Sequence, residues 1–313
     1  MNVSRHSIAI PALAALALLA GCTGQQALNT LTPTRGYDVA TNIVYDDATG
    51  QRLDIYSPDG VRHAPVVVFF FGSRWSEGAG AGKDNYKFVG QSLASEGFVA
   101  VIPNYRLYPK VKYPAFVQDG ARAVAWTRAN AQRYGGDPAK LFVMGHSAGA
   151  HIAAMLALDE DFLKAVNGSR TWLKGMIGLA GPYDFLPLTA PDLRDIFGPP
   201  DNYAVSQPIN HVDGLNPPLL LMHAETDQDV WPKNTYNLAQ AVKQQGGPVE
   251  TVIYPELKCV LGTSPHACIV AVMSYSLKDK SDVLKQVTDF VKQHAADAPR
   301  ASEQLHAVPL KAK

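Results

Sequence analysis

Val143-Met144-Gly145-His146-Ser147-Ala148-Gly149-Ala150-His151 is the stretch that decides the fold of this chain. It joins a short apolar run, Leu141–Met144, to a longer segment rich in Ala, Leu and Met that extends to Leu158. An apolar run followed by such a segment indicates a strand, a tight turn and a helix. Glycines lie two residues before and two residues after Ser147, where a turn this tight requires small residues. The stretch therefore predicts a strand–turn–helix unit with Ser147 at its turn.

A serine placed in this way matches the nucleophile-elbow pattern, which is G-x-S-x-G between a strand and a helix. The turn exposes the Ser147 hydroxyl above the edge of the sheet. The N–H of Ala148, at the start of the helix, points toward developing negative charge. The alternative is a glycine-rich turn with a bystander serine, because the five-residue pattern alone is not specific. The flanking strand and helix, with the partner residues described below, favour the elbow.

Apolar runs alternate with segments of helical periodicity along the chain. We expect strands at 39–45, 52–56, 66–71, 98–102, 141–144, 176–180, 219–223 and 249–254. We expect helices at 83–96, 115–134, 148–158, 236–245 and 281–294. This alternation predicts an α/β fold with a mostly parallel central sheet and helices on both faces. Functional residues in such a fold gather at the C-terminal ends of the strands.

The segment 182–216 breaks this alternation. It is rich in Pro, Asp and Asn, and it also contains the apolar and aromatic residues Phe185, Leu186, Phe197 and Tyr203. Long irregular insertions in compact domains often serve function. We interpret the segment as a lid-like or substrate-shaping insertion, with Tyr183 as a candidate substrate-shaping residue. A disordered surface excursion is the alternative.

A serine hydroxyl is inert at neutral pH without a base, and the base needs an acid to orient it. At an elbow of this type the chain order is Ser, then Asp or Glu, then His. The predicted strand 219–223 leads to three candidate acids, which are Glu225, Asp227 and Asp229. The first histidine after the predicted strand 249–254 is His266, and we predict it to be the base on a loop. His294 and His306 lie in the closing helix and the tail.

Two further histidines flank the serine. His146 is adjacent to Ser147 in sequence, so its side chain is expected to point away from the serine side chain. His151 lies one turn along the predicted helix and is expected to pack or to form a hydrogen bond locally. Neither is predicted to be the base.

Several segments resemble serine esterases of the α/β-hydrolase fold. His223-Ala224-Glu225-Thr226-Asp227-Gln228-Asp229-Val230 resembles their H-G-x-x-D-x-x-V segment, and this alignment selects Asp227 as the acid. Asn104-Tyr105-Arg106-Leu107-Tyr108-Pro109 is similar to the D-Y-R-L-x-P segment of the group related to hormone-sensitive lipase. Gly145–His151 looks more like the feruloyl-esterase-like, kynurenine-formamidase-like and prenylcysteine-methylesterase-like carboxylesterases.

The resemblance also points to an oxyanion hole. Phe71-Gly72-Ser73-Arg74-Trp75 resembles the H-G-G-x-W motif of these enzymes, with Phe71 in place of the His and Ser73 in place of the second Gly. Backbone N–H groups from Gly72, Ser73 or Arg74 are then expected to join that of Ala148 around the oxyanion. Trp75 is either a substrate-shaping residue or a packing residue.

The resemblance implies a serine carboxylesterase that hydrolyses small or medium carboxylic esters through an acyl-enzyme intermediate. It implies no metal and no organic cofactor. The alternatives are an amide hydrolase, arylformamidase-like or peptidase-like, on the same three residues, and a catalytically inactive binding lipoprotein. Lys and Arg together number 28, as do Asp and Glu, so the net charge of zero argues against a nucleic-acid partner.

Residues 1–21 are interpreted as a lipoprotein signal peptide. The apolar region 8–20 is too short to span a bilayer. Leu19-Ala20-Gly21-Cys22 resembles a bacterial lipobox, which implies cleavage before Cys22 and attachment of lipid, including palmitate, to that residue. The expected location is the cell envelope, on the outer membrane facing the periplasm or exported, and not the cytoplasm. A plain secretory signal is the alternative.

The remaining boundaries follow from composition. Residues 22–36 are expected to form a flexible tether, 37–295 the hydrolase domain and 296–313 a loose polar tail. Two further cysteines, Cys259 and Cys268, flank His266. An oxidising compartment permits a disulfide between them that would hold the His266 loop, and two free thiols are the alternative.

Overall fold

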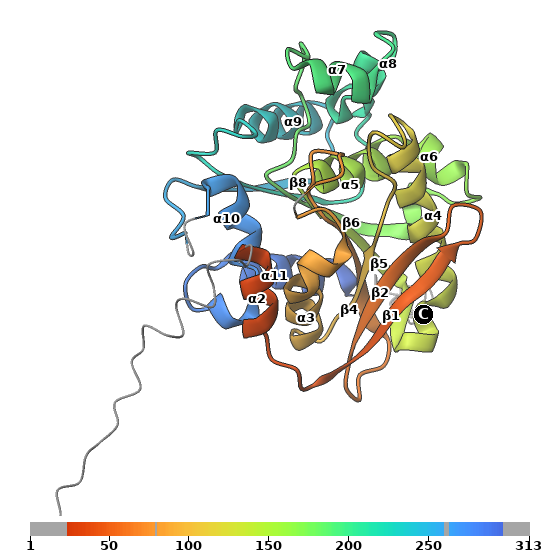
Figure 1. Cartoon of the computed structure of the whole chain (residues 1–313), viewed down its shortest axis with the longest axis vertical. Coiled ribbons are helices and arrows are strands. Elements are labelled where there is room, and N and C mark those ends of the chain that lie inside the picture. The colour runs from red at the N-terminus through yellow and green to blue at the C-terminus, as the bar shows by residue number, and fades with distance from the viewer. Residues whose placement is uncertain (1–23, 79, 260–262, 297–313) are drawn as a thin grey trace, which may run out of the picture.

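The computed structural model describes residues 24–78, 80–259 and 263–296, and it contains one eight-stranded sheet with the strand order β1-β2-β4-β3-β5-β6-β7-β8 (Figure 1). The strands are β1 (Tyr37–Asp46), β2 (Gln51–Pro58), β3 (Ala64–Phe70), β4 (Val99–Pro103), β5 (Gly136–His146), β6 (Leu173–Leu179), β7 (Leu219–Ala224) and β8 (Val249–Tyr254). The strand β2 is antiparallel to β1 and β4, and the strands from β4 to β8 pair in parallel. The predicted mostly parallel sheet is confirmed.

Helices cover both faces of this sheet. Successive side chains of a strand point to opposite faces, yet every residue from Val66 to Phe70 in β3 is fully buried. The principal helices are α3 (Lys87–Ser95), α4 (Ala115–Asn130), α5 (Ala148–Leu158), α9 (Lys233–Gln244) and α11 (Val283–Ala295). Short 3₁₀ turns precede α3 and follow α4, at Lys83–Tyr86 (η1) and Ala131–Tyr134 (η2). The helix α5 is buried along its whole length, as its Ala-rich composition predicts.

The insertion 182–216 is ordered and packs on the domain. It forms α7 (Pro191–Phe197), α8 (Asn202–Val205) and the 3₁₀ turn η4 (Pro208–His211), with α7 and α8 at the top of Figure 1. The Nε2 atom of His151 in α5 lies 2.8 Å from the carbonyl oxygen of Ser206, so the insertion is tied to the elbow helix. The disordered alternative is therefore excluded for this segment.

The prediction of a flexible tether at 22–36 is wrong for most of its described residues. Gly24–Leu31 forms the helix α2, which lies between α3 and α10 (Pro265–Ala271) in Figure 1. Leu28 is buried, and the Asn29 side chain accepts from the N–H of Phe88 and donates to the carbonyl of Asp84. The segment is mostly polar, so its composition indicated a tether, but it forms an amphipathic helix that buries only one narrow face.

Other parts of the predicted organisation lie outside the described residues. These are the signal peptide 1–21, Cys22 and the tail from residue 297 onward. Within the part of the chain that the structure describes, the helices are all too short or too polar to cross a bilayer.

Candidate active site

The turn at Ser147 connects β5 directly to α5. Ser147 has φ 54° and ψ −124°, a conformation that a non-glycine residue adopts at a cost on the order of 1–3 kcal/mol. The flanking glycines explain how the turn closes. A Cβ atom on Gly145 would lie 2.2 Å from the carbonyl oxygen of Gly149, and one on Gly149 would lie 2.0 Å from that of Phe70. Side chains at these two positions are therefore incompatible with the turn.

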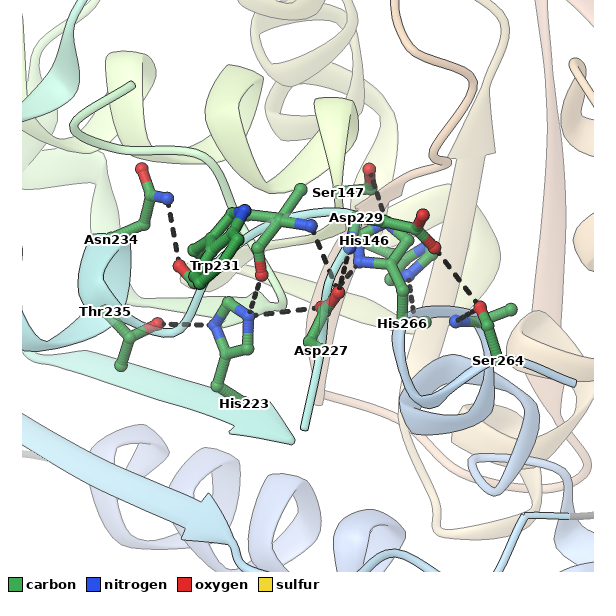
Figure 2. A network of polar contacts seen from close by, with 12 residues as sticks. His146, Ser147, His223, Asp227, Asp229, Trp231, Asn234, Thr235, Ser264 and His266 are labelled. Atoms are coloured by element: carbon green, nitrogen blue, oxygen red, sulfur yellow. Dashed lines mark hydrogen bonds and ion pairs between the residues drawn. The ribbon is translucent and has the colours of Figure 1, made fainter. Parts of the chain in front are cut away.

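Ser147, His266 and Asp227 form a hydrogen-bonded row (Figure 2). The Oγ atom of Ser147 lies 2.8 Å from Nε2 of His266, and Nδ1 of His266 lies 2.7 Å from Oδ2 of Asp227. Ser147 lies in the β5–α5 turn, Asp227 in the loop after β7 and His266 in the first turn of α10. The fold thus brings His266 next to Ser147, which is 119 positions away in sequence, and next to Asp227, which is 39 positions away.

Asp227 is held as a carboxylate. It is buried, and burial alone would raise its pKa, but hydrogen bonds from His223 and His266 lower the pKa of Asp227 well below its usual value. Its Oδ1 atom also accepts from the backbone N–H groups of Asp229 and Val230, at 2.9 and 3.0 Å. A buried anion with this many donors is fixed in position as well as in charge.

The two neighbouring acids are engaged elsewhere. The Glu225 carboxylate accepts from the hydroxyl of Tyr236, and that of Asp229 lies 3.3 Å from the hydroxyl of Ser264. Both acids are exposed, whereas Asp227 is buried beside His266. The structure therefore separates the three candidates that composition alone left equivalent.

His266 lies in the first turn of α10 and not on an irregular loop as predicted. Ser264 caps this helix by accepting from the N–H of Ala267, and Pro265 occupies the first helical position, which requires no N–H donor. Cys268 forms a disulfide with Cys259, with their Cα atoms 5.3 Å apart. The cap and the crosslink both restrain the segment that presents the imidazole.

Two histidines have contacts that sequence reasoning missed. His146 contacts the segment that holds His266, because its Nε2 lies 2.9 Å from the carbonyl oxygen of His266 and the two rings are 4.9 Å apart. Burial and the nearby His266 lower the pKa of His146 to about 3, so its imidazole is neutral and donates through Nε2. His223 places Nε2 3.2 Å from Oδ2 of Asp227. The leading His of the H-G-x-x-D-like segment was the available signal.

The loop after β3 lies directly against the elbow. A Cβ on Gly72 would lie 2.9 Å from Cβ of Ser147 and 2.8 Å from Nδ1 of His146. Arg74 and Trp75 follow with φ values of 54° and 56°, so two consecutive non-glycine residues adopt the left-handed conformation. Ala148 begins α5 immediately after Ser147. The candidate donors Gly72, Ser73 and Ala148 are thus all adjacent to the serine.

A cavity of about 670 Å³ opens over this site. Gly72, Ser73, Ser147 and His266 line it, together with apolar side chains from the insertion, among them Phe185, Leu186 and Leu193. Trp75 lines the cavity and also packs on Phe185 and Phe197, so both of its expected roles are compatible with its position.

Tyr183 does not line this cavity, and its proposed substrate-shaping role is wrong. The residue is fully buried, and a Cβ on Gly178 or Gly181 would lie 1.9 or 2.3 Å from its hydroxyl oxygen. Tyr183 therefore fills a space left by two glycines in the core. Its neighbour Pro182 lines the cavity instead.

Asp227, Asp229 and His266 also have the spacing of a metal site, since one potential ligand atom from each lies within 4.8 Å of the others. The Nδ1 atom of His266 and Oδ2 of Asp227, however, are already hydrogen-bonded to one another. This pairing fits an acid–base pair better than a set of metal ligands.

The sequence profile of the BD-FAE family matches residues 53–242, which is more than half of the chain and includes Ser147 and Asp227. The chain belongs to the BD-FAE family. The BD-FAE match ends before His266, and the hydrogen bonds of His266 connect it with the other two residues.

Curated relatives of this BD-FAE protein are named as esterases. An isoprenylcysteine alpha-carbonyl methylesterase of Arabidopsis thaliana is 28% identical over 240 residues, covering 69% of this chain and 55% of that enzyme. Esterase LipC of Mycobacterium tuberculosis is 29% identical over 212 residues, covering 62% and 52%. The chain spans about half the length of these relatives.

Solved structures share the fold of this BD-FAE protein. A truncated carbohydrate esterase from gut microbiota superposes with a TM-score of 0.71 at 21% identity, covering 85% of this chain and 99% of that one. A hyperthermophilic esterase from the archaeon Pyrobaculum calidifontis superposes with a TM-score of 0.69 at 22% identity. The match covers 87% of this chain and 91% of that one. At these identities the likeness establishes the α/β-hydrolase fold.

Proposed function

We propose that this protein is a serine carboxylesterase in which Ser147 is the nucleophile, His266 the general base and Asp227 the orienting acid. The hydrogen-bonded row from Ser147 Oγ through the His266 ring to Asp227 carries the proposal, because this arrangement activates a serine hydroxyl. The esterase names of the relatives and the cavity above Ser147 support it.

The first half of the reaction forms an acyl-enzyme. Ser147 Oγ attacks the ester carbonyl carbon while Nε2 of His266 accepts the hydroxyl proton. The tetrahedral oxyanion is stabilised by the N–H of Ala148 and by those of the Gly72–Ser73 segment. Loss of one such donor costs on the order of 100-fold in rate. Collapse of the intermediate breaks the bond to the alkoxy oxygen, which leaves as the alcohol with the proton from His266.

The second half releases the acid. Water loses a proton to His266 and attacks the acyl carbon, and the second tetrahedral intermediate expels Ser147, which regains its proton from His266. Asp227 accepts the Nδ1–H bond throughout, so the imidazole presents its unprotonated Nε2 to the serine and the imidazolium is stabilised once formed. The low pKa of Asp227 keeps the carboxylate charged in this role.

The cavity supports small or medium ester substrates. Its volume of about 670 Å³ accommodates a drug-sized molecule, and its apolar wall from the insertion suits an acyl or alkoxy group of moderate size. The exposed Trp231 lies at the same cavity and extends the apolar surface outward.

A panel of p-nitrophenyl esters from acetate upward tests the proposal. We expect hydrolysis by the wild-type protein and loss of at least about 1,000-fold in Ser147→Ala, with the exposed Ser95→Ala as the matched control at wild-type rate. Matched p-nitroanilides test the amide-hydrolase alternative, and we expect much slower turnover of these. Full activity in Ser147→Ala, or amide turnover exceeding ester turnover, would overturn the proposal.

We also propose that Cys22 carries a lipid anchor in the cell envelope, which rests on the lipobox-like sequence at 19–22. Expression of the full chain in a bacterium fed a clickable palmitate analogue tests it. Wild-type protein should acquire the label and fractionate with membranes, whereas Cys22→Ser should not. Equal labelling of the two proteins would contradict the anchor.

A further inference from the structure

We propose that Tyr86 and Tyr105 are positioning residues that aim two backbone N–H groups, those of Gly72 and Ser73, at the oxyanion of the reaction proposed above. The inference rests on that proposed function. It concerns the loop after β3, where the chain departs from the motif it resembles by having Phe71 and Ser73.

Each tyrosine holds one carbonyl group of this loop. The hydroxyl of Tyr105 donates to the carbonyl oxygen of Phe71 at 2.7 Å, and the hydroxyl of Tyr86 donates to that of Gly72 at 2.9 Å. Two consecutive carbonyls are thus fixed by side chains 34 and 14 positions away in sequence.

The geometry of the peptide bond transmits this constraint to the N–H groups. The bonds 71–72 and 72–73 are trans, and in a planar trans peptide the N–H points opposite to the C=O. A carbonyl of Phe71 directed at Tyr105 therefore turns the Gly72 N–H away from Tyr105. In the same way, Tyr86 turns the N–H of Ser73 away from itself.

The contacts of Gly72 place this loop beside the serine. A Cβ on Gly72 would contact Cβ of Ser147 at 2.9 Å, and Gly72 and Ser73 line the same cavity as Ser147. Ala148 begins α5 directly after Ser147, so the loop and the helix start lie on the part of the site where a tetrahedral oxyanion needs donors.

The two phenols are rigid and remain protonated. The ring of Phe71 is stacked between them, 4.5 Å from Tyr105 and 5.9 Å from Tyr86, with interplanar angles of 19° and 21°. Burial raises the pKa of Tyr86 to about 12 and that of Tyr105 further, so both hydroxyls stay donors across the working pH range. The Phe71 substitution in the motif supplies the ring that both tyrosines pack against.

We call the two hydroxyls of Tyr86 and Tyr105, with the loop carbonyls that they hold, the clamp. The helix α2 brings the N-terminal segment next to the clamp through Gln25. The side chain of Gln25 lies close enough to the Tyr86 phenol to lower its pKa slightly, against the larger effect of burial. Gln25 also lines the cavity above Ser147. The segment expected to be a mere tether thus contributes to the active site.

Single-atom variants test the clamp. Tyr86→Phe and Tyr105→Phe keep the stacked rings and remove the hydroxyls. The matched control is Tyr37→Phe, which removes the hydroxyl of another buried tyrosine, a part-buried hydroxyl that donates to the carbonyl of Pro33 at 2.5 Å. We expect kcat to fall about 10- to 100-fold in Tyr86→Phe and Tyr105→Phe, with KM within about twofold, because only the transition state uses the oxyanion donors. Tyr37→Phe should keep wild-type kcat.

A transition-state analogue separates positioning from general destabilisation. A trifluoromethyl ketone forms a tetrahedral oxyanion adduct with Ser147, and its affinity should fall by the same factor as kcat in Tyr86→Phe and Tyr105→Phe. Unchanged ketone affinity in both, or an equal loss of kcat in Tyr37→Phe, would overturn the clamp. If neither tyrosine variant folds, Gln25→Leu tests the clamp from its outer end. A several-fold loss of kcat and of ketone affinity supports it, and wild-type values contradict it.

The failure of the clamp differs from failure of the proposed function. Activity that is lost in Ser147→Ala but unaffected in all clamp variants would leave the serine esterase intact and remove the clamp. A wild-type protein that neither hydrolyses esters nor binds the ketone would overturn both.

Discussion

The elbow at Ser147 and the loop at Phe71–Trp75 follow neighbouring parallel strands, β5 and β3, in which Gly145 pairs with Phe70. Both loops contain strained non-glycine residues, but their conformations have different origins. The elbow is set locally, since two glycines within five residues allow the backbone to pass at contact distance. The second loop is set remotely, by tyrosines 14 and 34 positions away. A motif search can recognise the first kind of loop, whereas the second kind becomes visible only in the folded protein.

The largest loss of activity is expected from a substitution at one of the two glycines of the elbow. Gly149→Ala would place a Cβ 2.0 Å from a backbone oxygen of β3, so we expect loss of the native elbow and of all measurable ester hydrolysis. Gly50→Ala is the matched control, since its Cβ would meet open space and its positive φ costs about 1–2 kcal/mol without a steric clash. Circular dichroism, thermal unfolding and activity assays measure the outcome. An active, stable Gly149→Ala protein would contradict the view that the two local glycines set the conformation of the elbow.

A large catalytic effect without unfolding is expected at the acid. Asp227→Asn should lower kcat about 1,000- to 10,000-fold, because an amide no longer holds His266 in the required tautomer. Asp229→Asn should stay within a few-fold of wild type, since its carboxylate bonds to Ser264 and not to the imidazole. Steady-state kinetics on one p-nitrophenyl ester compares the two. The reverse order of effects would reassign the acid.

Sequence reasoning succeeded where local rules suffice. The sheet and most helix positions followed from periodicity, because an apolar run such as 66–70 must be buried on both faces. It was wrong at 22–36, where α2 gains stability from tertiary packing of Leu28 and not from its own composition. It was wrong at Tyr183, because the two glycines that make room for this ring lie in β6 and in the loop after it, and no local pattern encodes how they pack. The contacts of His146 were missed for the same reason, whereas the contact of His223 with Asp227 had a signal in the H-G-x-x-D-like segment.

Acidification should weaken the elbow region through its neutral histidines. Burial lowers the pKa of His146 to about 3 and that of His151 to about 4, whereas the unfolded value is about 6.5. The free energy of unfolding that each neutral histidine contributes is therefore fully present above pH about 6.5. It is lost as the pH falls toward 4, by on the order of 1 kcal/mol per pH unit for each group.

Thermal unfolding between pH 7.5 and 4.5 measures this loss. His151→Gln keeps a side-chain donor toward Ser206 and removes the titration, so the decline of its Tm with falling pH should be shallower than that of wild type. Parallel pH profiles for the two proteins would contradict the assignment of His151 as a buried neutral group.

The smallest effect is expected at the crosslink near His266. Removing the disulfide with Cys259→Ser should lower the free energy of unfolding by about 2–3 kcal/mol, since the loop that it closes is short. Kcat should fall modestly, because the Ser264 cap still positions the first turn of α10. Thiol titration of unreduced, denatured Cys22→Ser protein should detect no free thiol. Two thiols would show that Cys259 and Cys268 are not paired.

The most direct test of the central claim is labelling by a fluorophosphonate, which reacts with serines that a neighbouring base has activated. A soluble form lacking residues 1–22 is incubated with the probe, and the modified peptide is located by mass spectrometry. We expect stoichiometric label on Ser147 in the wild-type protein, and none in Ser147→Ala. A wild-type protein that stays unlabelled, or that is labelled at another serine while Ser147 is unmodified, would contradict it.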